Sequence, residues 1–348
     1  MHRRHFLSTL SALAAARSVL AAAGGGSRLG FAAFSCHQHW KAVREGAPGV
    51  KFGDARGFYD YARTLGGDGV QTSLRGRDAG YAKALRAHVE ESGGYFEGDI
   101  ALPKAGENPE AFETDVRLVC DAGATVARAV LTGARRYESF KTLAEFRDFQ
   151  AQSERRLAAV APILKRHRLK LAIENHKDHT APELAALLRK TDSEWVGITV
   201  DTGNNIALLE DPQAVIEALA PFAFTVHLKD MALQPYEDGF LLSEVPLGAG
   251  YLDLPRMVAT LRKANPAIVF NIEMATRDPL KVPCRTDAYW TTFGARRDAD
   301  LAAALERVRQ NPPKEPPPVV AGKTLAEILA DEEKNNRRCT AARSGLGL

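Results

Sequence analysis

Short runs of apolar residues alternate along the chain with longer segments in which apolar residues recur every three or four positions. The short runs have the length and composition of buried strands, and the longer segments have the spacing of amphipathic helices. The expected strands are 29–36, 69–74, 95–102, 125–131, 170–176, 195–201, 222–229 and 268–274. The expected helices are 58–65, 79–93, 109–122, 143–167, 180–189, 212–220 and 254–264. Eight such alternations over roughly 250 residues predict a single-domain (β/α)8 TIM barrel of the α/β class.

Four of the later expected strands carry metal-binding side chains at or near their carboxyl ends. These side chains are Glu174, Asp201, His227 and Glu273, and each follows an apolar run. A barrel brings the carboxyl ends of its strands to one central mouth, whereas a doubly wound sheet, the alternative fold, does not. The first expected strand is also not followed by the glycine-rich phosphate loop of a nucleotide-binding doubly wound sheet, which further favours the barrel.

These four side chains together have the chemistry of a metal site. Three carboxylates at one mouth would repel one another strongly in a pocket of low dielectric constant. A divalent cation removes that repulsion, and a set of oxygen ligands with one imidazole suits Mn²⁺, with Mg²⁺, Co²⁺ or Zn²⁺ as alternatives. We therefore expect one divalent metal ion bound by Glu174, Asp201, His227 and Glu273.

The sequence around these residues resembles the sugar phosphate isomerase/epimerase superfamily, the xylose isomerase-like TIM barrels. The matching stretches are Ile-Glu-Asn-His (173–176), Val-Asp-Thr-Gly-Asn (200–204), Val-His-Leu-Lys-Asp (226–230), Pro-Leu-Gly-Ala-Gly (246–250) and Ile-Glu (272–273). The resemblance implies that strands five to eight bind one metal ion. It also implies that Glu174 and Glu273 are the catalytic acid/base pair.

Two positions depart from the superfamily pattern. Asn204 stands where some epimerases carry a histidine, and an amide can bind a hydroxyl group but cannot shuttle a proton. Ala249 stands where an acidic residue is frequent, so we expect the glycine-rich loop to shape the pocket rather than to react.

The residues are consistent with proton abstraction next to a carbonyl group. A metal ion stabilises the enediolate that forms, and carboxylates remove and return the proton. We therefore expect a sugar isomerase or epimerase acting on a keto sugar. The alternatives are a lyase with the same first step, namely a keto-sugar or inosose dehydratase or a 3-keto-glycoside eliminase, and a non-catalytic sugar-binding barrel.

Three candidate substrate contacts lie close to the expected ligands in the sequence. His176 follows Glu174 by two residues and shares its face of an extended strand. Asn204 follows the aspartate motif. Lys229 shares a face with His227 and is expected either to bind substrate oxygen or to form a salt bridge with Asp230 or Glu273.

Three further candidate contacts are more distant. His37 ends the first expected strand, and Arg277 and Trp290 follow the last one. Arg277 could hold an anionic group and Trp290 could stack on a sugar ring, although both residue types also occur in rim salt bridges and packing.

The two ends of the chain differ from the expected barrel at 27–310. Residues 1–26 begin with a twin arginine, Arg3-Arg4, followed by an Ala-rich run, which is typical of a twin-arginine export signal and linker and predicts a periplasmic location. Residues 311–348 contain a Pro-rich linker at 311–318 and an expected helix at 324–338. This helix is expected to pack on the barrel or to form a homo-oligomer contact.

Composition and charge exclude some classes of partner. The chain has 348 residues with 45% hydrophobic and 26% charged residues, as in an ordinary globular enzyme. The formal net charge of +3 comes from three arginines within residues 1–23, so the remainder is neutral. A neutral surface disfavours nucleic acid as a partner. It therefore also disfavours a DNA-repair function, although some DNA-repair enzymes share this barrel. We expect a small-molecule carbohydrate partner and no membrane span after signal removal.

Overall fold

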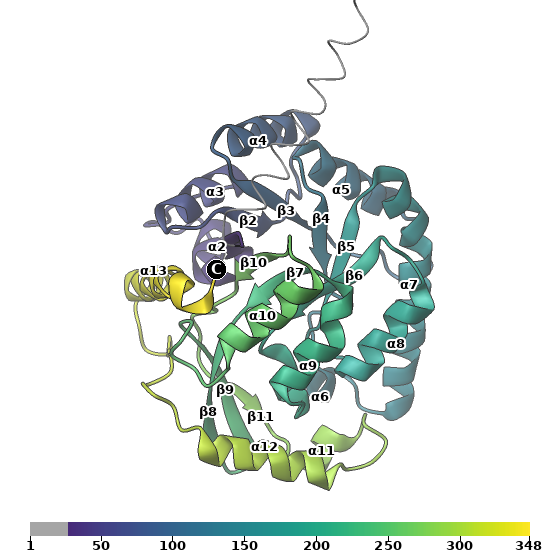
Figure 1. Cartoon of the computed structure of the whole chain (residues 1–348), viewed down its shortest axis with the longest axis vertical. Coiled ribbons are helices and arrows are strands. Elements are labelled where there is room, and N and C mark those ends of the chain that lie inside the picture. Colours follow the sequence, from purple (N-terminus) through teal and green to yellow (C-terminus); the bar gives the residue numbers. More distant parts are fainter. Residues whose placement is uncertain (1–26) are drawn as a thin grey trace, which may run out of the picture.

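The computed structural model describes residues 27–348, and these form a closed barrel of eight parallel strands surrounded by helices (Figure 1). The strands follow one another around the barrel in chain order, with β10 closing onto β1. Their bounds are β1 Leu29–Ala32, β2 Gly69–Thr72, β3 Tyr95–Asp99, β4 Val126–Ala129, β5 Lys170–Glu174, β6 Val196–Asp201, β7 Ala223–Leu228 and β10 Val269–Ile272. The expected (β/α)8 barrel is confirmed. The expected signal at 1–26 lies outside the described residues.

Helices cover the outer face of the barrel, as the sequence pattern predicts. They are α2 His37–Arg44, α3 Ala55–Thr64, α4 Ala79–Glu91, α5 Glu110–Asp121, α7 Leu143–His167, α8 Ala181–Thr191, α9 Pro212–Leu219 and α10 Leu254–Ala264, with a short α6 at Arg136–Ser139. Helix α8 begins with a capping box in which Thr180 and Glu183 satisfy each other's backbone N–H groups. Within residues 27–348, no helix is long and apolar enough to cross a membrane.

Side chains alternate between the outer and inner faces of the barrel wall. Ile173, Val200 and Val226 belong to the main hydrophobic cluster between strands and helices and are fully buried. The inner face is polar instead. There the Glu97 carboxylate accepts hydrogen bonds from Thr225 Oγ1 at 2.8 Å and Asn271 Nδ2 at 2.9 Å. The barrel interior is therefore a hydrogen-bonded network with apolar packing around it.

The first strand is shorter than the sequence pattern predicts. β1 ends at Ala32, and the chain continues as a 3-10 turn, η1 (Ala33–Cys36), directly into α2. Ser35 causes this break, because its hydroxyl donates to the carbonyl oxygen of Ile272 and accepts from Met274 N at 3.3 Å. His37 consequently begins a helix and does not end a strand.

Three strands outside the barrel were not expected. β8 (Asp230–Tyr236), β9 (Gly239–Val245) and β11 (Leu280–Val282) form an antiparallel sheet that packs with α11 (Asp287–Trp290) and α12 (Asp298–Gln310) at one edge of the molecule (Figure 1). The glycine-rich loop after β9 folds around Asp230, whose carboxylate accepts from Gly248 N and Gly250 N, both at 2.9 Å. A Cβ atom at Gly250 would lie 2.0 Å from Asp230 Oδ1, so this close approach requires glycine.

The C-terminal helix α13 (Leu325–Ala341) lies against α2 on the outside of the barrel (Figure 1). The contact is polar and buried. Glu332 accepts from the backbone N–H groups of Gln38 at 2.8 Å and His39 at 3.1 Å, and from His39 Nδ1 at 2.6 Å. Asn336 Nδ2 donates to Ser35 O at 2.9 Å. Packing on the barrel is thus the observed role of the helix, and its expected role in association stays a prediction.

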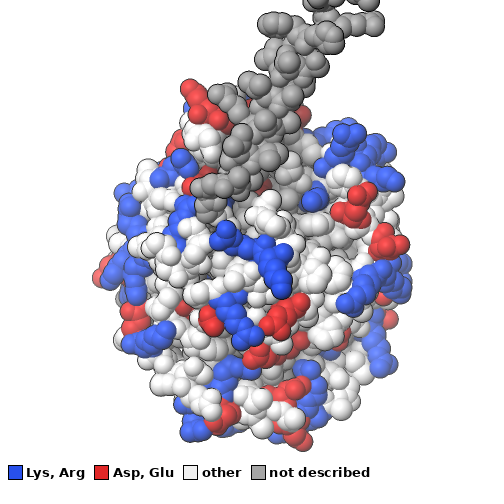
Figure 2. Space-filling view, in the orientation of Figure 1, with Lys and Arg blue, Asp and Glu red and all other residues white. Residues whose placement is uncertain are grey.

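Charged side chains of both signs are interspersed over the molecular face in view (Figure 2). No strongly basic region dominates that face. The distribution agrees with the neutral net charge of the chain after residue 23.

We expect Glu332→Gln to lower the free energy of unfolding by about 1–3 kcal/mol, because a buried charged acceptor for three donors at the start of α2 is lost. Urea unfolding followed by circular dichroism measures the change. The matched control is Glu333→Gln, whose carboxylate pairs with Arg337 near the surface and is expected to contribute under about 1 kcal/mol. Equal effects of the two substitutions would contradict the role assigned to Glu332.

Candidate metal centre

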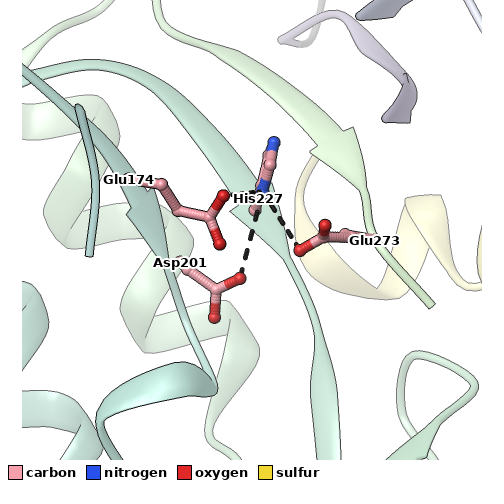
Figure 3. Close-up of side chains that lie close together, drawn as sticks. All are labelled: Glu174, Asp201, His227 and Glu273. Carbon is pink, nitrogen blue, oxygen red and sulfur yellow. Dashed lines mark ion pairs between the residues drawn. The ribbon is translucent and has the colours of Figure 1, made fainter. Parts of the chain in front are cut away.

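Four neighbouring strands deliver one ligand each to the carboxyl mouth of the barrel. Glu174 and Asp201 end β5 and β6, His227 lies near the end of β7, and Glu273 directly follows β10. The parallel register places Asp201 beside His227 and His227 beside Asn271. One ligand atom from each of the four residues lies within 4.8 Å of all the others (Figure 3).

The geometry of this cluster fits a cation. His227 Nδ1 lies 3.1 Å from Glu273 Oε2, 3.5 Å from Glu174 Oε2 and 4.0 Å from Asp201 Oδ2 (Figure 3). Three of these atoms, Asp201 Oδ2, His227 Nδ1 and Glu273 Oε2, are buried and make no hydrogen bond of good geometry. Buried ligand atoms that point at one centre without hydrogen bonds of good geometry are the arrangement expected of a metal site.

Hydrogen bonding orients His227 for this role. Its Nε2 lies 2.6 Å from Gln71 Oε1, while Gln71 Nε2 donates to Glu97 Oε2 at 2.9 Å. Because the Gln71 amide group donates to Glu97, its oxygen is left to accept the His227 Nε2–H. The proton therefore stays on Nε2, and Nδ1 faces the three carboxylates. These carboxylates, with Glu273 foremost, outweigh burial and raise the pKa of His227, so a cation at the centre would compete with a proton for Nδ1.

Positive side chains surround the acidic cluster. Lys229 Nζ lies 3.0 Å from Asp201 Oδ2 and 2.8 Å from Glu273 Oε2, which agrees with the salt bridge considered for it. Arg128 Nε donates to Glu174 Oε2 at 2.8 Å, and Arg128 Nη1 pairs with Asp99 at 3.1 Å. These cations offset much of the repulsion between the carboxylates. Some lone pairs of the buried ligand atoms still have neither a hydrogen-bond donor nor a cation.

The carboxyl groups respond differently to this environment. Burial raises the pKa of Glu174, but the nearby positive charges, with Arg128 foremost, outweigh it and bring the pKa to about 2. Burial dominates at Asp201 and raises its pKa to about 6 despite Lys229. The pKa of Glu273 is lowered because His227 and Lys229 outweigh burial. At neutral pH all three residues are thus carboxylates and can accept a metal ion or a proton.

Two of the expected substrate contacts lie directly beside the metal ligands. Asn204 Nδ2 donates to Glu174 Oε1 at 2.8 Å, and its Oδ1 accepts from Lys229 Nζ at 3.2 Å. His176 lies past the end of β5, where the chain turns and its N–H donates to Glu174 O at 2.9 Å. It therefore does not share a strand face with Glu174, but its Nδ1 is buried and has no hydrogen-bond partner.

The other three expected contacts, His37, Arg277 and Trp290, lie in three different environments. His37 is half-buried and stacks on Phe34 at the mouth of the barrel. Arg277 pairs bidentately with Glu244, at 2.9 and 2.5 Å. Trp290 is only 5% exposed, and its indole N–H donates to Cys284 O at 2.8 Å. It belongs to the hydrophobic cluster beneath the outer sheet, which agrees with the packing alternative considered for it, and its stacking on a sugar ring stays a prediction.

Several residues of the site were missed in the sequence. Arg128 is a charged residue inside an expected strand, and Lys177 directly follows the Glu-Asn-His motif. Both positions are visible in the sequence and could have indicated a role in the site. Gln71 and Glu97 carry no local signal of a role. Glu244 lies in β9, a strand that the periodicity did not predict.

A cavity of about 410 Å³ opens onto the cluster. His227, Glu273 and Arg128 line its inner end, and Phe34 and Trp40 line its outer part. Phe34 is 42% exposed, which is unusual for a large apolar side chain and marks it as a contact surface at the mouth. A larger hollow of about 780 Å³ includes Arg28 and Ile268 at the opposite end of the barrel, away from the metal ligands.

Comparison with known proteins identifies similar sequences. The sequence model of the xylose isomerase-like TIM barrel family matches residues 59–309. A curated relative, 3-oxo-isoapionate decarboxylase from Pectobacterium atrosepticum, is 30% identical over 139 residues, which are 39% of this chain and 50% of the relative. The match thus spans about half the length of that relative.

Solved structures share the fold at low sequence identity. A D-psicose 3-epimerase crystallised in the presence of D-fructose has a TM-score of 0.56 at 14% identity, covering 85% of this chain and 94% of the epimerase. A D-psicose 3-epimerase with D-tagatose from Clostridium cellulolyticum has a TM-score of 0.56 at 13% identity, covering 81% and 98%. A xylose isomerase-like TIM barrel protein from Mycobacterium smegmatis in complex with magnesium has a TM-score of 0.51 at 15% identity, covering 82% and 99%.

We expect Gln71→Leu to weaken Mn²⁺ binding by about 10- to 100-fold, because His227 loses the acceptor that fixes its proton on Nε2. Isothermal titration of the metal-free protein with Mn²⁺ measures the affinity. Gln213→Leu, on the outer helix α9, is the control and should bind Mn²⁺ like the wild type. Unchanged affinity in Gln71→Leu would contradict the orienting role of Gln71.

Proposed function

The chain belongs to the xylose isomerase-like TIM barrel family, and we propose that it is a divalent-metal-dependent isomerase or epimerase of keto sugars. The observation that carries this proposal is the convergence of Glu174, Asp201, His227 and Glu273, with one ligand atom from each within 4.8 Å of the others. Mn²⁺ is the proposed metal, with Mg²⁺, Co²⁺ or Zn²⁺ as alternatives. The family and the fold are compatible with many reactions, so the proposal of metal-dependent chemistry rests on the four proposed ligands.

The proposed reaction begins with removal of a proton from the carbon next to the substrate carbonyl group. A bound divalent cation supplies Lewis-acid stabilisation of the negative charge that develops. Glu273 and Glu174 are the proposed bases, because both are carboxylates at neutral pH and lie on different sides of the cluster (Figure 3). Lys229, which contacts Glu273 at 2.8 Å, holds that carboxylate in place.

The cavity supports a sugar-sized substrate. Its volume of about 410 Å³ falls in the range of small-molecule sites. Phe34 and Trp40 offer apolar faces to the C–H groups of a sugar, while Thr72, Ser73 and Asp99 offer hydrogen-bonding groups. Glu273 lines the same cavity, so a substrate bound there meets a proposed base directly.

A lyase is the second candidate, and the similarity to 3-oxo-isoapionate decarboxylase favours it. A dehydratase of keto sugars or inososes, or an eliminase of 3-keto-glycosides, begins with the same proton removal. A decarboxylase reaches an equivalent enediolate by loss of CO₂. The firm pairing of Glu174 with Arg128 and Asn204 also fits a reaction that needs only one mobile base.

The test is deuterium exchange. We expect Mn²⁺-loaded protein in D₂O to introduce deuterium next to the carbonyl group of its substrate, measured by NMR over a panel of ketoses, inososes and 3-keto-glycosides. Glu174→Gln and Glu273→Gln should each lower the exchange rate by at least about 100-fold, because a general base is lost. The product spectrum then distinguishes isomerisation, epimerisation and elimination.

The matched control is Glu217→Gln on the exposed side of α9, which should exchange at the wild-type rate. Tight metal binding without exchange on any compound would favour a non-catalytic sugar-binding barrel. Failure of the wild-type protein to bind a divalent metal would refute the proposed function as a whole.

We also propose that the protein is exported to the periplasm, which the twin arginine Arg3-Arg4 and the following Ala-rich run support. Replacing both arginines by lysine should remove the protein from the periplasmic fraction of a bacterial host, as measured by immunoblotting. Arg17→Lys is the control and should leave export unchanged. Periplasmic protein in the double variant would contradict twin-arginine export.

A further inference from the structure

Lys177 is a buried cation without a carboxylate partner. It directly follows the Glu-Asn-His motif, is only 3% exposed, and donates from Nζ to the amide oxygen of Asn204. Among residues 27–348, no carboxylate oxygen lies within ion-pair distance of this ammonium group, although the neighbouring Lys229 contacts three carboxylates. A buried charge without a counter-charge is costly, and a protein retains one where a ligand supplies the counter-charge.

Burial and nearby positive charges disfavour the charged form of Lys177. Burial, together with Lys229 and Arg277, lowers its pKa to about 8, although the more distant charges of Glu244 and Asp201 act in the opposite direction. Asn204 Oδ1 accepts from Lys177 and Lys229 at once, so two ammonium groups share one neutral oxygen. An anion placed beside Lys177 would relieve this repulsion.

A second polar group beside Lys177 also lacks a partner. The Nδ1 of His176, the preceding residue, is buried and makes no hydrogen bond. Burial, together with the charge of Lys177, lowers the pKa of His176 to about 4, so its ring is neutral at neutral pH. An ammonium group and a free imidazole nitrogen are thus both open to polar ligand atoms.

The ion pairs of the site single out Lys177. Lys229, Arg128 and Arg277 each lie within ion-pair distance of at least one carboxylate, whereas Lys177, among the described residues, has only the amide oxygen of Asn204. A ligand with a single negative charge would supply the missing partner, and a neutral sugar would not.

We infer that the substrate carries a carboxylate group and that Lys177 pairs with it, with His176 beside it. The substrate class is therefore a keto-sugar acid, which deepens the proposed function and rests on it. A carboxylate fits better than a phosphate ester, because one cation, Lys177, lacks a counter-charge and a phosphate monoester carries nearly two negative charges at neutral pH.

Paired ligands that differ mainly in the carboxylate test this inference. D-Fructuronate and D-fructose share a keto-sugar skeleton, and hydroxypyruvate and dihydroxyacetone form a second pair. Isothermal titration of Mn²⁺-loaded protein should show at least about tenfold tighter binding of each acid than of its neutral partner, as expected for a charged hydrogen bond. D-Fructose 6-phosphate is included as the dianionic comparison.

Lys177→Met should weaken binding of the acids by about 10- to 100-fold and change binding of the neutral sugars by less than about threefold. Lys177→Arg should retain a preference for the acids, because it keeps the charge. Removal of an unpaired buried charge is not expected to lower the thermal midpoint, so folding and binding effects can be separated. Lys190→Met, which affects an exposed pair with Glu154, is the matched control.

The outcomes distinguish this inference from the proposed function. Equal weakening of acids and neutral sugars in Lys177→Met would assign Lys177 to holding Asn204 and overturn the carboxylate subsite. Preference of the wild type for neutral sugars or for D-fructose 6-phosphate would also overturn it, while deuterium exchange on those compounds would still support the proposed function. Lys177-dependent binding of the acids without any exchange would uphold the subsite and count against the proposed reaction.

Discussion

Three carboxylates and an imidazole are buried within 4.8 Å of one another, and the rest of the site is arranged around that repulsion. The apolar barrel wall cannot solvate these charges, so they require positive partners. Arg128 binds Glu174 from one side, and Lys229 binds Asp201 and Glu273 from the other. Both arrangements leave lone pairs facing the centre, where a divalent cation could bind in addition to the cluster's own cations.

The polar interior of the barrel extends this organisation below the cluster. Glu97 accepts hydrogen bonds from Gln71, Thr225 and Asn271, and Gln71 in turn holds His227. Burial raises the pKa of Glu97, and these three donors oppose the rise. The chain of contacts ties the orientation of one metal ligand to strands on the opposite side of the barrel.

Parts of the chain outside the segment matched by the family complete the cavity. That segment is 59–309, whereas Phe34 and His37 precede it and α13 follows it. Glu332 and Asn336 of α13 bind the backbone at the start of α2 and in the turn before it. The C-terminal helix thus supports the residues at the mouth of the cavity.

The sequence alone was sufficient for the barrel and for the four proposed ligands, because both depend on local order. An apolar strand can be identified from a few adjacent residues, and in a parallel barrel the end of every such strand reaches the same mouth. Glu174, Asp201, His227 and Glu273 could therefore be placed together before any contact was known. The tertiary structure alone decided which charges pair. Lys177 and Lys229 are both lysines near a strand end, yet only Lys229 contacts carboxylates, and Trp290 is buried under a sheet that no periodicity predicted. Pairing and burial of this kind depend on contacts between residues far apart in the chain, which local patterns do not encode.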